Sequence, residues 1–144
     1  MGAPKPSLSA LLVCDMVIED KMTNKKSIIG SFTDIWAQTF PCVQPRMAVY
    51  FCLTDAEGSY DILLRLLNTD TELLLAQAGF TVGIPDRFVI QDFGVGLPPV
   101  QFPVAGRYEL QIFANKEFLG RKEFRVTPVP PPGEGEIAPP EQST

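Results

Sequence analysis

The sequence contains no histidine. Histidine is the side chain that most often serves as a general base, activates nucleophiles and supplies nitrogen ligands to metals. A phosphate-binding glycine loop is also missing, because the Gly-Val-Gly-Leu-Pro-Pro stretch at 94–99 has neither the spacing of such loops nor a following helix. These absences predict a protein that is not an enzyme, has no catalytic residues and uses no cofactor or metal.

Cysteine is scarce, and the three residues present, Cys14, Cys42 and Cys52, cannot all pair within one chain. They form no Cys-x-x-Cys motif of the kind that predicts a zinc site. We therefore expect buried, free thiols. Unpaired cysteines favour a reducing compartment, so the sequence predicts a cytoplasmic protein.

Long apolar runs and excess positive charge are lacking as well. No segment approaches the ~20 apolar residues of a membrane-spanning helix. The 12 basic residues are outnumbered by 17 acidic ones, for a net charge of -5. Because nucleic-acid-binding proteins gather lysine and arginine on one face, we expect neither a membrane nor a nucleic acid as partner.

What the sequence does contain is alternation of apolar and polar residues, most clearly in Phe102–Phe124. A two-residue period is typical of a half-buried strand, and the Asn115-Lys116 pair can form the turn of a β-hairpin. One face of the predicted strand is apolar and carries Tyr108, Leu110 and Ile112. The other face is polar and carries Arg107, Glu109 and Gln111. Within the same stretch, Gly106-Arg107-Tyr108 resembles the tyrosine corner of immunoglobulin-like sandwiches.

Shorter alternating segments precede this hairpin, and turn signals separate them. Residues 46–54 carry apolar side chains on both faces, which indicates a strand in the middle of a layered structure or one covered by a loop. Pro41 and Pro45 bracket a loop that a central strand would not tolerate. The remaining strand candidates are 8–19, 27–37, 60–68, 72–79 and 80–93, the last broken at 83–86 and ended by the glycine and proline cluster.

Residues 60–79 allow two interpretations. Their leucines suit a helical hairpin as well as two strands. The turn signal at 68–71 divides the stretch into pieces too short for stable helices, so we favour strands, with room for one short helix.

These patterns predict an all-β fold, an antiparallel immunoglobulin-like β-sandwich of about seven to nine strands. We expect a flexible leader at 1–7, one sandwich domain at 8–126 and a disordered tail rich in proline and glutamate at 127–144.

Three residues are candidates for an interaction surface: Asp15, Trp36 and Tyr50. Asp15 interrupts an apolar strand, and if it points inward it needs a partner such as Lys25, Lys26 or a backbone amide of the adjoining turn. The alternation instead favours a partly exposed carboxylate that pins the first hairpin. Trp36 and Tyr50 each join an apolar body to a polar tip, as binding patches require, although core packing is the commoner role of such residues.

Two blocks, Cys14–Ala37 and Phe102–Val126, resemble an uncharacterised family of small bacterial proteins described only as a domain of unknown function. Asn24 and Lys116 stand where that family commonly has glycine in its turns. The resemblance implies a cytosolic, single-domain sandwich of immunoglobulin-like or C2-like type, and it implies no activity and no site residues.

The function that we predict is that of a non-catalytic adaptor, which recognises another protein through a sheet face or loop rim. A second copy of the chain, paired through an edge strand, is one such partner. The alternative is a sandwich that binds a small ligand or calcium, since Glu19-Asp20 and Asp55-x-Glu57 place carboxylates at strand ends.

Overall fold

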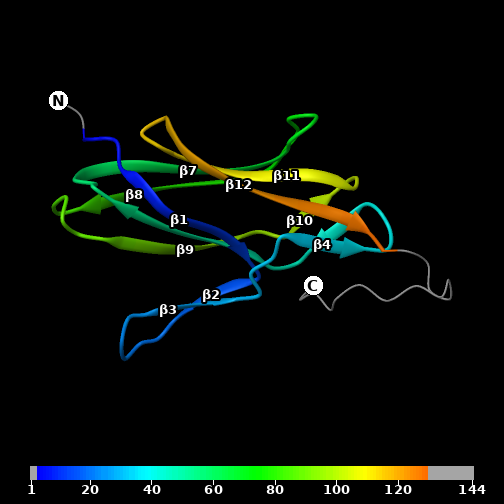
Figure 1. Cartoon of the computed structure of the whole chain (residues 1–144), viewed down its shortest axis with the longest axis horizontal. Coiled ribbons are helices and arrows are strands. Elements are labelled where there is room, and N and C mark those ends of the chain that lie inside the picture. The colour runs from blue at the N-terminus through cyan, green and yellow to red at the C-terminus, as the bar shows by residue number, and fades with distance from the viewer. Residues whose placement is uncertain (1–2, 130–144) are drawn as a thin grey trace.

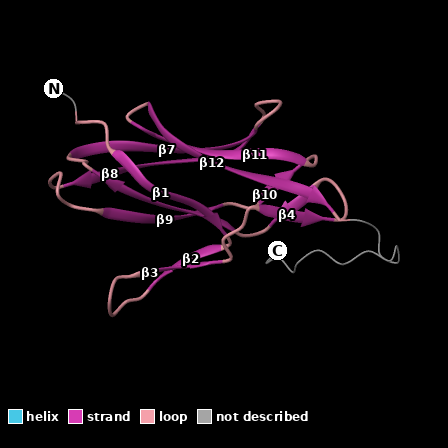
Figure 2. Ribbon diagram, viewed as in Figure 1, coloured by secondary structure: helices cyan, strands magenta, loops and turns pink. Residues whose placement is uncertain are grey.

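The computed structural model describes residues 3–129, which form two β-sheets packed face to face (Figure 1). All regular structure in this part of the chain is strand (Figure 2). The strands are β1 (Ser7–Cys14), β2 (Met16–Glu19), β3 (Lys26–Ile29), β4 (Asp34–Ala37), β5 (Cys42–Gln44), β6 (Met47–Thr54), β7 (Gly58–Asn68), β8 (Leu74–Ile84), β9 (Gln91–Leu97), β10 (Val100–Phe102), β11 (Gly106–Ala114) and β12 (Glu117–Pro128). The all-β sandwich is confirmed, with more strands than predicted.

The larger sheet has the order β4-β12-β11-β7-β8 and the smaller one the order β1-β6-β9. Two further pairs, β2-β3 and β10-β5, complete the fold. Every pairing is antiparallel as predicted except that of β12 with β4, which is parallel. The predicted loop between Pro41 and Pro45 contains the short strand β5. This strand pairs with β10 on one side only, so it is not a central strand, which agrees with its flanking prolines.

The core lies between the two sheets. In β6, the central strand of the smaller sheet, alternate residues from Met47 to Leu53 are buried against the larger sheet, as the apolar pattern of 46–54 predicts. The β2-β3 hairpin packs on the other side of β6 and β9, where Val17 contacts the backbone of Gly94. Apolar side chains on both faces of β6 are therefore covered, which explains their pattern.

The predicted strands at 8–19 and 27–37 are each divided in two. At Asp15 the chain leaves its pairing with β6, and the Asp15 amide instead donates hydrogen bonds of 3.0 Å to the carbonyls of Ile29 and Gly30. Gly30 adopts a positive φ of 70°, which ends β3 before the chain reaches β4 in the other sheet. A two-residue period does not reveal such changes of sheet, because the alternation continues through them.

Residues 60–79 form strands, which decides the ambiguity of the leucine-rich stretch. Asn68 ends β7, and its Oδ1 accepts hydrogen bonds of 2.9 Å from the amides of Asp70 and Thr71. The predicted turn at 68–71 is thus confirmed. In contrast, the glycine and proline cluster does not end the strand predicted at 80–93, because Gly94 and Gly96 lie inside β9.

The β11-β12 hairpin is confirmed, and Asn115 and Lys116 take positive φ angles of 49° and 71° in its turn. At the other end of β11, the buried Tyr108 hydroxyl donates a hydrogen bond of 2.6 Å to the carbonyl of Val104. A tyrosine at the start of a late strand that bonds to the backbone a few residues upstream is the geometry of a tyrosine corner. The predicted immunoglobulin-like corner is therefore present.

Both predicted domain boundaries differ from the structure. The leader was expected at 1–7, but Ala3 packs on the core and the Pro4 carbonyl accepts a 2.6 Å hydrogen bond from the Tyr60 hydroxyl. At the other end β12 continues to Pro128, because Arg125–Pro128 pair with β4. The rest of the predicted tail, 130–144, lies outside the described residues.

Candidate functional site

Asp15, the first predicted candidate, is buried at the junction of β1 and β2, with 8% of its surface exposed. Its Oδ1 accepts one long hydrogen bond of 3.5 Å, from Nε2 of the buried Gln44. The expectation of a partly exposed carboxylate is wrong, and the partner of this inward-facing group is Gln44 rather than Lys25 or Lys26. The backbone amide of Asp15, rather than its carboxylate, holds the β2-β3 hairpin.

Tyr50, the second candidate, is half-buried on β6 and faces away from the core. Its hydroxyl donates a 2.9 Å hydrogen bond to Asp92 on β9, whose other carboxylate oxygen lies 2.9 Å from Nζ of Lys26 on β3. Burial and the bond to Asp92 raise the pKa of Tyr50 to about 12. Burial alone would raise the pKa of Asp92, but the hydrogen bonds from Lys26 and Tyr50 lower it below its ordinary value. This network anchors the hairpin to the smaller sheet.

Trp36, the third candidate, is half-buried on β4, at the edge of the larger sheet. Its Nε1 is buried and has no hydrogen-bond partner among the residues described. Trp36 and Tyr50 thus belong to different sheets, and Asp15 lies where the chain changes partner strands. The three predicted residues do not form one site.

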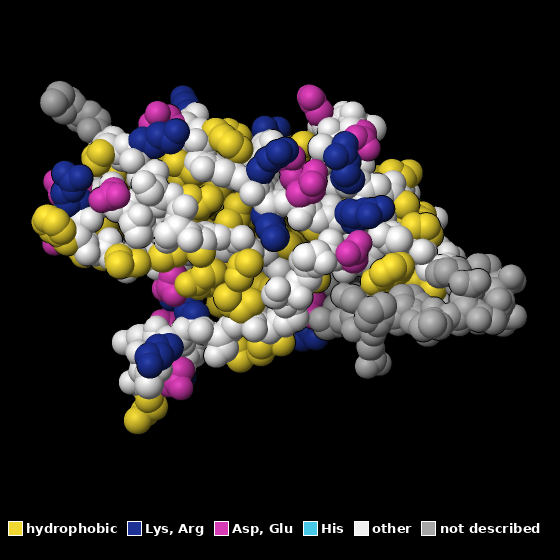
Figure 3. Space-filling model, in the orientation of Figure 1, with side chains coloured by type: hydrophobic (Ala, Val, Ile, Leu, Met, Phe, Trp, Pro, Cys, Tyr) yellow, Lys and Arg dark blue, Asp and Glu magenta, His cyan; other side chains and the backbone are white. Residues whose placement is uncertain are grey.

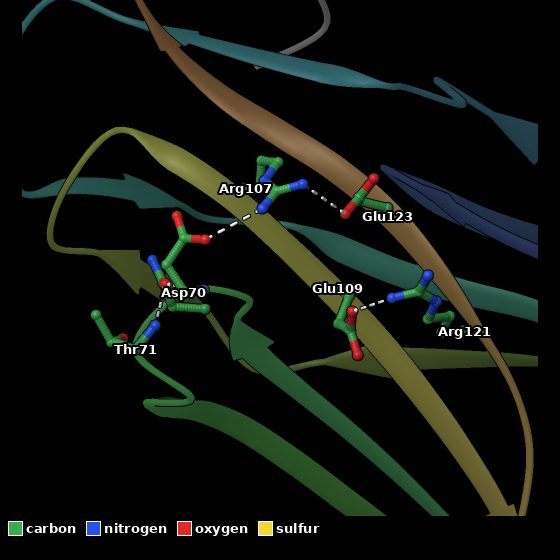
Figure 4. A network of polar contacts seen from close by, with 7 residues as sticks. Asp70, Thr71, Arg107, Glu109, Arg121 and Glu123 are labelled. Atoms are coloured by element: carbon green, nitrogen blue, oxygen red, sulfur yellow. Dashed lines mark hydrogen bonds and ion pairs between the residues drawn. The ribbon is translucent and has the colours of Figure 1, made fainter.

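A different group of residues gathers on the outer face of the larger sheet. Glu109 lies on the central strand β11, and its side chain is 7% exposed. One carboxylate oxygen accepts a hydrogen bond of 3.1 Å from Nη1 of Arg121 (Figure 4). The other accepts a hydrogen bond of 2.6 Å from Nε2 of Gln111. The carboxylate is thus satisfied on both sides.

Beside Glu109, Arg107 joins the β7-β8 turn to β12. Its Nη2 lies 3.2 Å from Asp70 and its Nη1 3.9 Å from Glu123 (Figure 4). All three side chains are well exposed. Figure 3 shows basic and acidic side chains intermixed over β11 and β12.

The register of the strands arranges this outer face in rows. Gln111 lies opposite Arg65 of β7 and Arg121 of β12, and Arg65 lies opposite Gln77 of β8. These four residues form a polar row across the sheet. The next row toward the Asn115-Lys116 turn is apolar and consists of Gly79, Leu63, Phe113 and Phe118.

Arg65 stands between two hollows on this face. A polar hollow of about 390 Å³ is lined by Arg65, Glu109, Arg121 and their neighbours. A second hollow of about 650 Å³ is lined by Arg65, Leu63, Phe113, Lys116 and the backbone around Gly79. Arg65 is half-buried, and within residues 3–129 it forms no ion pair. We call Arg65 and the two hollows the Arg65 face.

A family of unknown function, DUF6941, matches residues 9–127. The chain belongs to this family. The resemblance to an uncharacterised family is thereby confirmed.

No curated protein matches this DUF6941 member. Among solved structures it is similar to an immunoglobulin-like protein from Pseudomonas aeruginosa, with 13% identity, 85% of this chain and 97% of the other chain covered, and a TM-score of 0.39.

In this DUF6941 member, the sequence places Glu109 and Gln111 on the polar face of the last hairpin, which is correct. It does not reveal that Glu109 is buried, because its cover comes from neighbouring strands. The sequence pattern of 60–68 could have pointed to Arg65, because this residue is a charged side chain within a leucine-rich strand. Its position beside Gln111 depends on the pairing of β7 with β11.

Neither a metal site nor a membrane-spanning helix is found in the described part of the chain. No three Cys, Asp or Glu side chains among residues 3–129 gather closely enough to hold a metal ion. No helix there is long and apolar enough to cross a bilayer.

Proposed function

We propose that this protein is a non-catalytic binding module that holds an extended segment of another protein on the Arg65 face. The observation that carries the proposal is the half-buried Arg65, which forms no ion pair within residues 3–129 and lies between a polar and an apolar hollow. The segment that fits carries a carboxylate side chain next to a large apolar one.

The charges of the polar row indicate that the bound segment carries a carboxylate. Arg121 already neutralises Glu109, so Arg65 is the cation on this row that has no ion-pair partner among the described residues. A guanidinium offers two parallel N–H groups to a carboxylate, and such charge-assisted bonds are about twice as strong as neutral ones. Partial burial of Arg65 reduces the competition from water.

The neighbouring apolar row indicates that the bound segment also carries a large apolar side chain. Phe113 and Phe118 meet edge to face, with ring centroids 5.6 Å apart, and Phe118 remains 45% exposed. Gly79 adds no side chain over this part of the sheet, which leaves the hollow beside Leu63 open. Exposed aromatic rings beside an arginine are the residues most enriched in protein interfaces.

The absence of catalysis is part of the proposal. Burial, together with the nearby Asp15 charge, raises the pKa of the Cys14 thiol to about 11, and burial also raises the pKa of Cys42. Both are therefore thiols rather than reactive thiolates at neutral pH. The three unpaired cysteines support a reducing compartment, and we place the protein in the cytoplasm.

Selection from a library of random peptides displayed on phage tests the proposal. The enriched peptides should share an acidic residue within two positions of a large apolar residue. Their affinity, measured by calorimetry, should fall by about tenfold in Arg65→Gln, which corresponds to one lost charge-assisted bond. Arg87→Gln removes an exposed arginine from the segment between β8 and β9 and should leave the affinity unchanged.

Two results would contradict the proposal. One is enrichment of peptides without an acidic residue. The other is equal affinity of the wild-type protein and Arg65→Gln for every selected peptide. The native partner should show the same dependence on Arg65. A protein that the wild type captures from a host lysate should be lost with Arg65→Gln and retained with Arg87→Gln.

A further inference from the structure

A third hollow, of about 230 Å³, opens on the smaller sheet and shares no lining residue with the Arg65 face. Its walls come from the start of β2, the start of β6 and the end of β9. Two of the lining residues are charged, Asp15 and Arg46. The Lys26–Asp92 ion pair holds the β2-β3 hairpin in place beside this hollow.

Asp15 is a buried acid whose hydrogen bonding is incomplete. The single bond from Gln44 to Oδ1 is long, at 3.5 Å, and the same Nε2 also donates to the Arg46 carbonyl at 3.2 Å. Oδ2 receives no hydrogen bond from the residues described, and none of their cations forms an ion pair with Asp15. Oδ2 is not among the fully buried atoms that lack a partner, so this oxygen remains accessible to a ligand although Asp15 as a whole is buried. A charged or hydrogen-bonding group that reaches it stabilises such a carboxylate.

The backbone of Asp15 is held in place. Its amide is bonded to the carbonyls of Ile29 and Gly30 at 3.0 Å. Across the hollow, a Cβ built on Gly96 would meet no atom within 4 Å, so this wall is open. The site thus offers a preformed space, a buried carboxylate and an arginine that forms no ion pair within residues 3–129.

We infer that this hollow binds a small free α-amino acid, with the ammonium group on Asp15 and the carboxylate on Arg46. The ammonium group supplies the charge and the donors that Oδ2 lacks. Arg46 supplies the complementary charge for the carboxylate. The apolar side chains of Met16 and Val17, which also line the hollow, receive the side chain of the ligand. This site is separate from the protein-binding face proposed above and does not depend on it.

Titration of the ¹⁵N-labelled protein with L-alanine, L-serine, L-valine and L-leucine tests the inference. The amide signals of Gly94, Gly96 and Asp15 should shift in saturable fashion at millimolar concentrations of at least one of them. Ethylamine carries only the ammonium group and propionate only the carboxylate, and each should bind at least about tenfold more weakly than that amino acid.

Three variants separate the parts of the site. Asp15→Asn and Arg46→Gln should each weaken binding by about tenfold or more, as loss of one charged partner does. Gly96→Val fills the hollow from a position where the Cβ meets no atom within 4 Å, so it should abolish binding in a folded protein. Asp70→Asn removes an exposed carboxylate from the β7-β8 turn and should bind like the wild type.

The inference is overturned if none of the four amino acids shifts the Gly94 and Gly96 signals. It is overturned equally if ethylamine or propionate binds as tightly as the amino acid, or if Gly96→Val binds like the wild type. Should Asp15→Asn fail to fold, Arg46→Gln and Gly96→Val still decide the matter.

Discussion

Glu109 and Arg121 form an ion pair of 3.1 Å in which the carboxylate is buried and the guanidinium is exposed, with side-chain exposures of 7% and 60%. A carboxylate at the centre of the larger sheet thus depends on a cation at its surface. Gln111 completes the set by donating to the other oxygen. The ion pair keeps Arg121 on the polar row and leaves Arg65 as the cation of that row without an ion pair in the described part of the chain.

Removal of Arg121 should therefore be costly. Arg121→Met leaves the buried Glu109 charge with Gln111 alone, and we expect a loss of about 1–3 kcal/mol in the free energy of unfolding. Urea denaturation followed by circular dichroism measures it. Arg107→Met is the matched control: its ion pairs are exposed, and it should cost less than about 1 kcal/mol. Equal losses for the two variants would show that the burial of Glu109 has no energetic consequence.

The tyrosine corner should stabilise the start of β11. Tyr108→Phe removes the 2.6 Å hydrogen bond to the Val104 carbonyl but keeps the buried ring. We expect the free energy of unfolding to fall by about 0.5–1.5 kcal/mol, the usual net contribution of one hydrogen bond. A denaturation midpoint equal to that of the wild type would contradict this role.

The Tyr50–Asp92–Lys26 network should make stability fall at high pH. The pKa of Tyr50 is raised in the folded state from 10.0 to about 12. The folded protein therefore holds the phenolic proton more tightly than the unfolded chain does. The resulting stabilisation is fully present below pH 10 and is lost as pH rises toward 12.

Thermal melts of the wild type and Tyr50→Phe across this range check the prediction. The variant should lose stability less steeply above pH 10, since it has no phenol at this position to ionise. Parallel curves for the two proteins would refute the assignment.

Gly94 should be required for the β2-β3 hairpin to lie on β9. A Cβ at this position would come within 2.6 Å of Cγ1 and 2.8 Å of Cβ of Val17, whose branched side chain has little freedom to move. We expect Gly94→Ala to destabilise the protein by about 1–3 kcal/mol, as overpacking does.

Two further variants control for this steric effect. Gly96→Ala adds the same methyl group to β9 in open space and should be nearly neutral. Val17→Ala combined with Gly94→Ala should recover part of the lost stability, because it removes the contact with Cγ1 and leaves only the one with Cβ. Additive losses in the double variant would place the cause elsewhere.

Local signals were sufficient where the chain pairs with its neighbour in sequence. The β11-β12 hairpin could be predicted because its alternation and its Asn115-Lys116 turn lie within one short segment. The burial of alternate β6 residues and the turn at Asn68 were also readable, since both follow from period and turn chemistry. Predictions failed at Asp15 and Gly30, where the chain changes from one partner strand to another.

The amino-acid sequence by itself determined that this chain forms β-strands, which side chains face the core, and where the main hairpin turns. Those properties depend on the two-residue period and on the φ angles that individual residues accept. Only the tertiary structure decided that Glu109 is buried, that Arg65 lies between two hollows with no ion pair to residues 3–129, and that Asp15 lines a third hollow. Each of these depends on strands brought together from distant parts of the chain, and burial and electrostatic pairing are set by neighbours in space, which a local pattern does not encode.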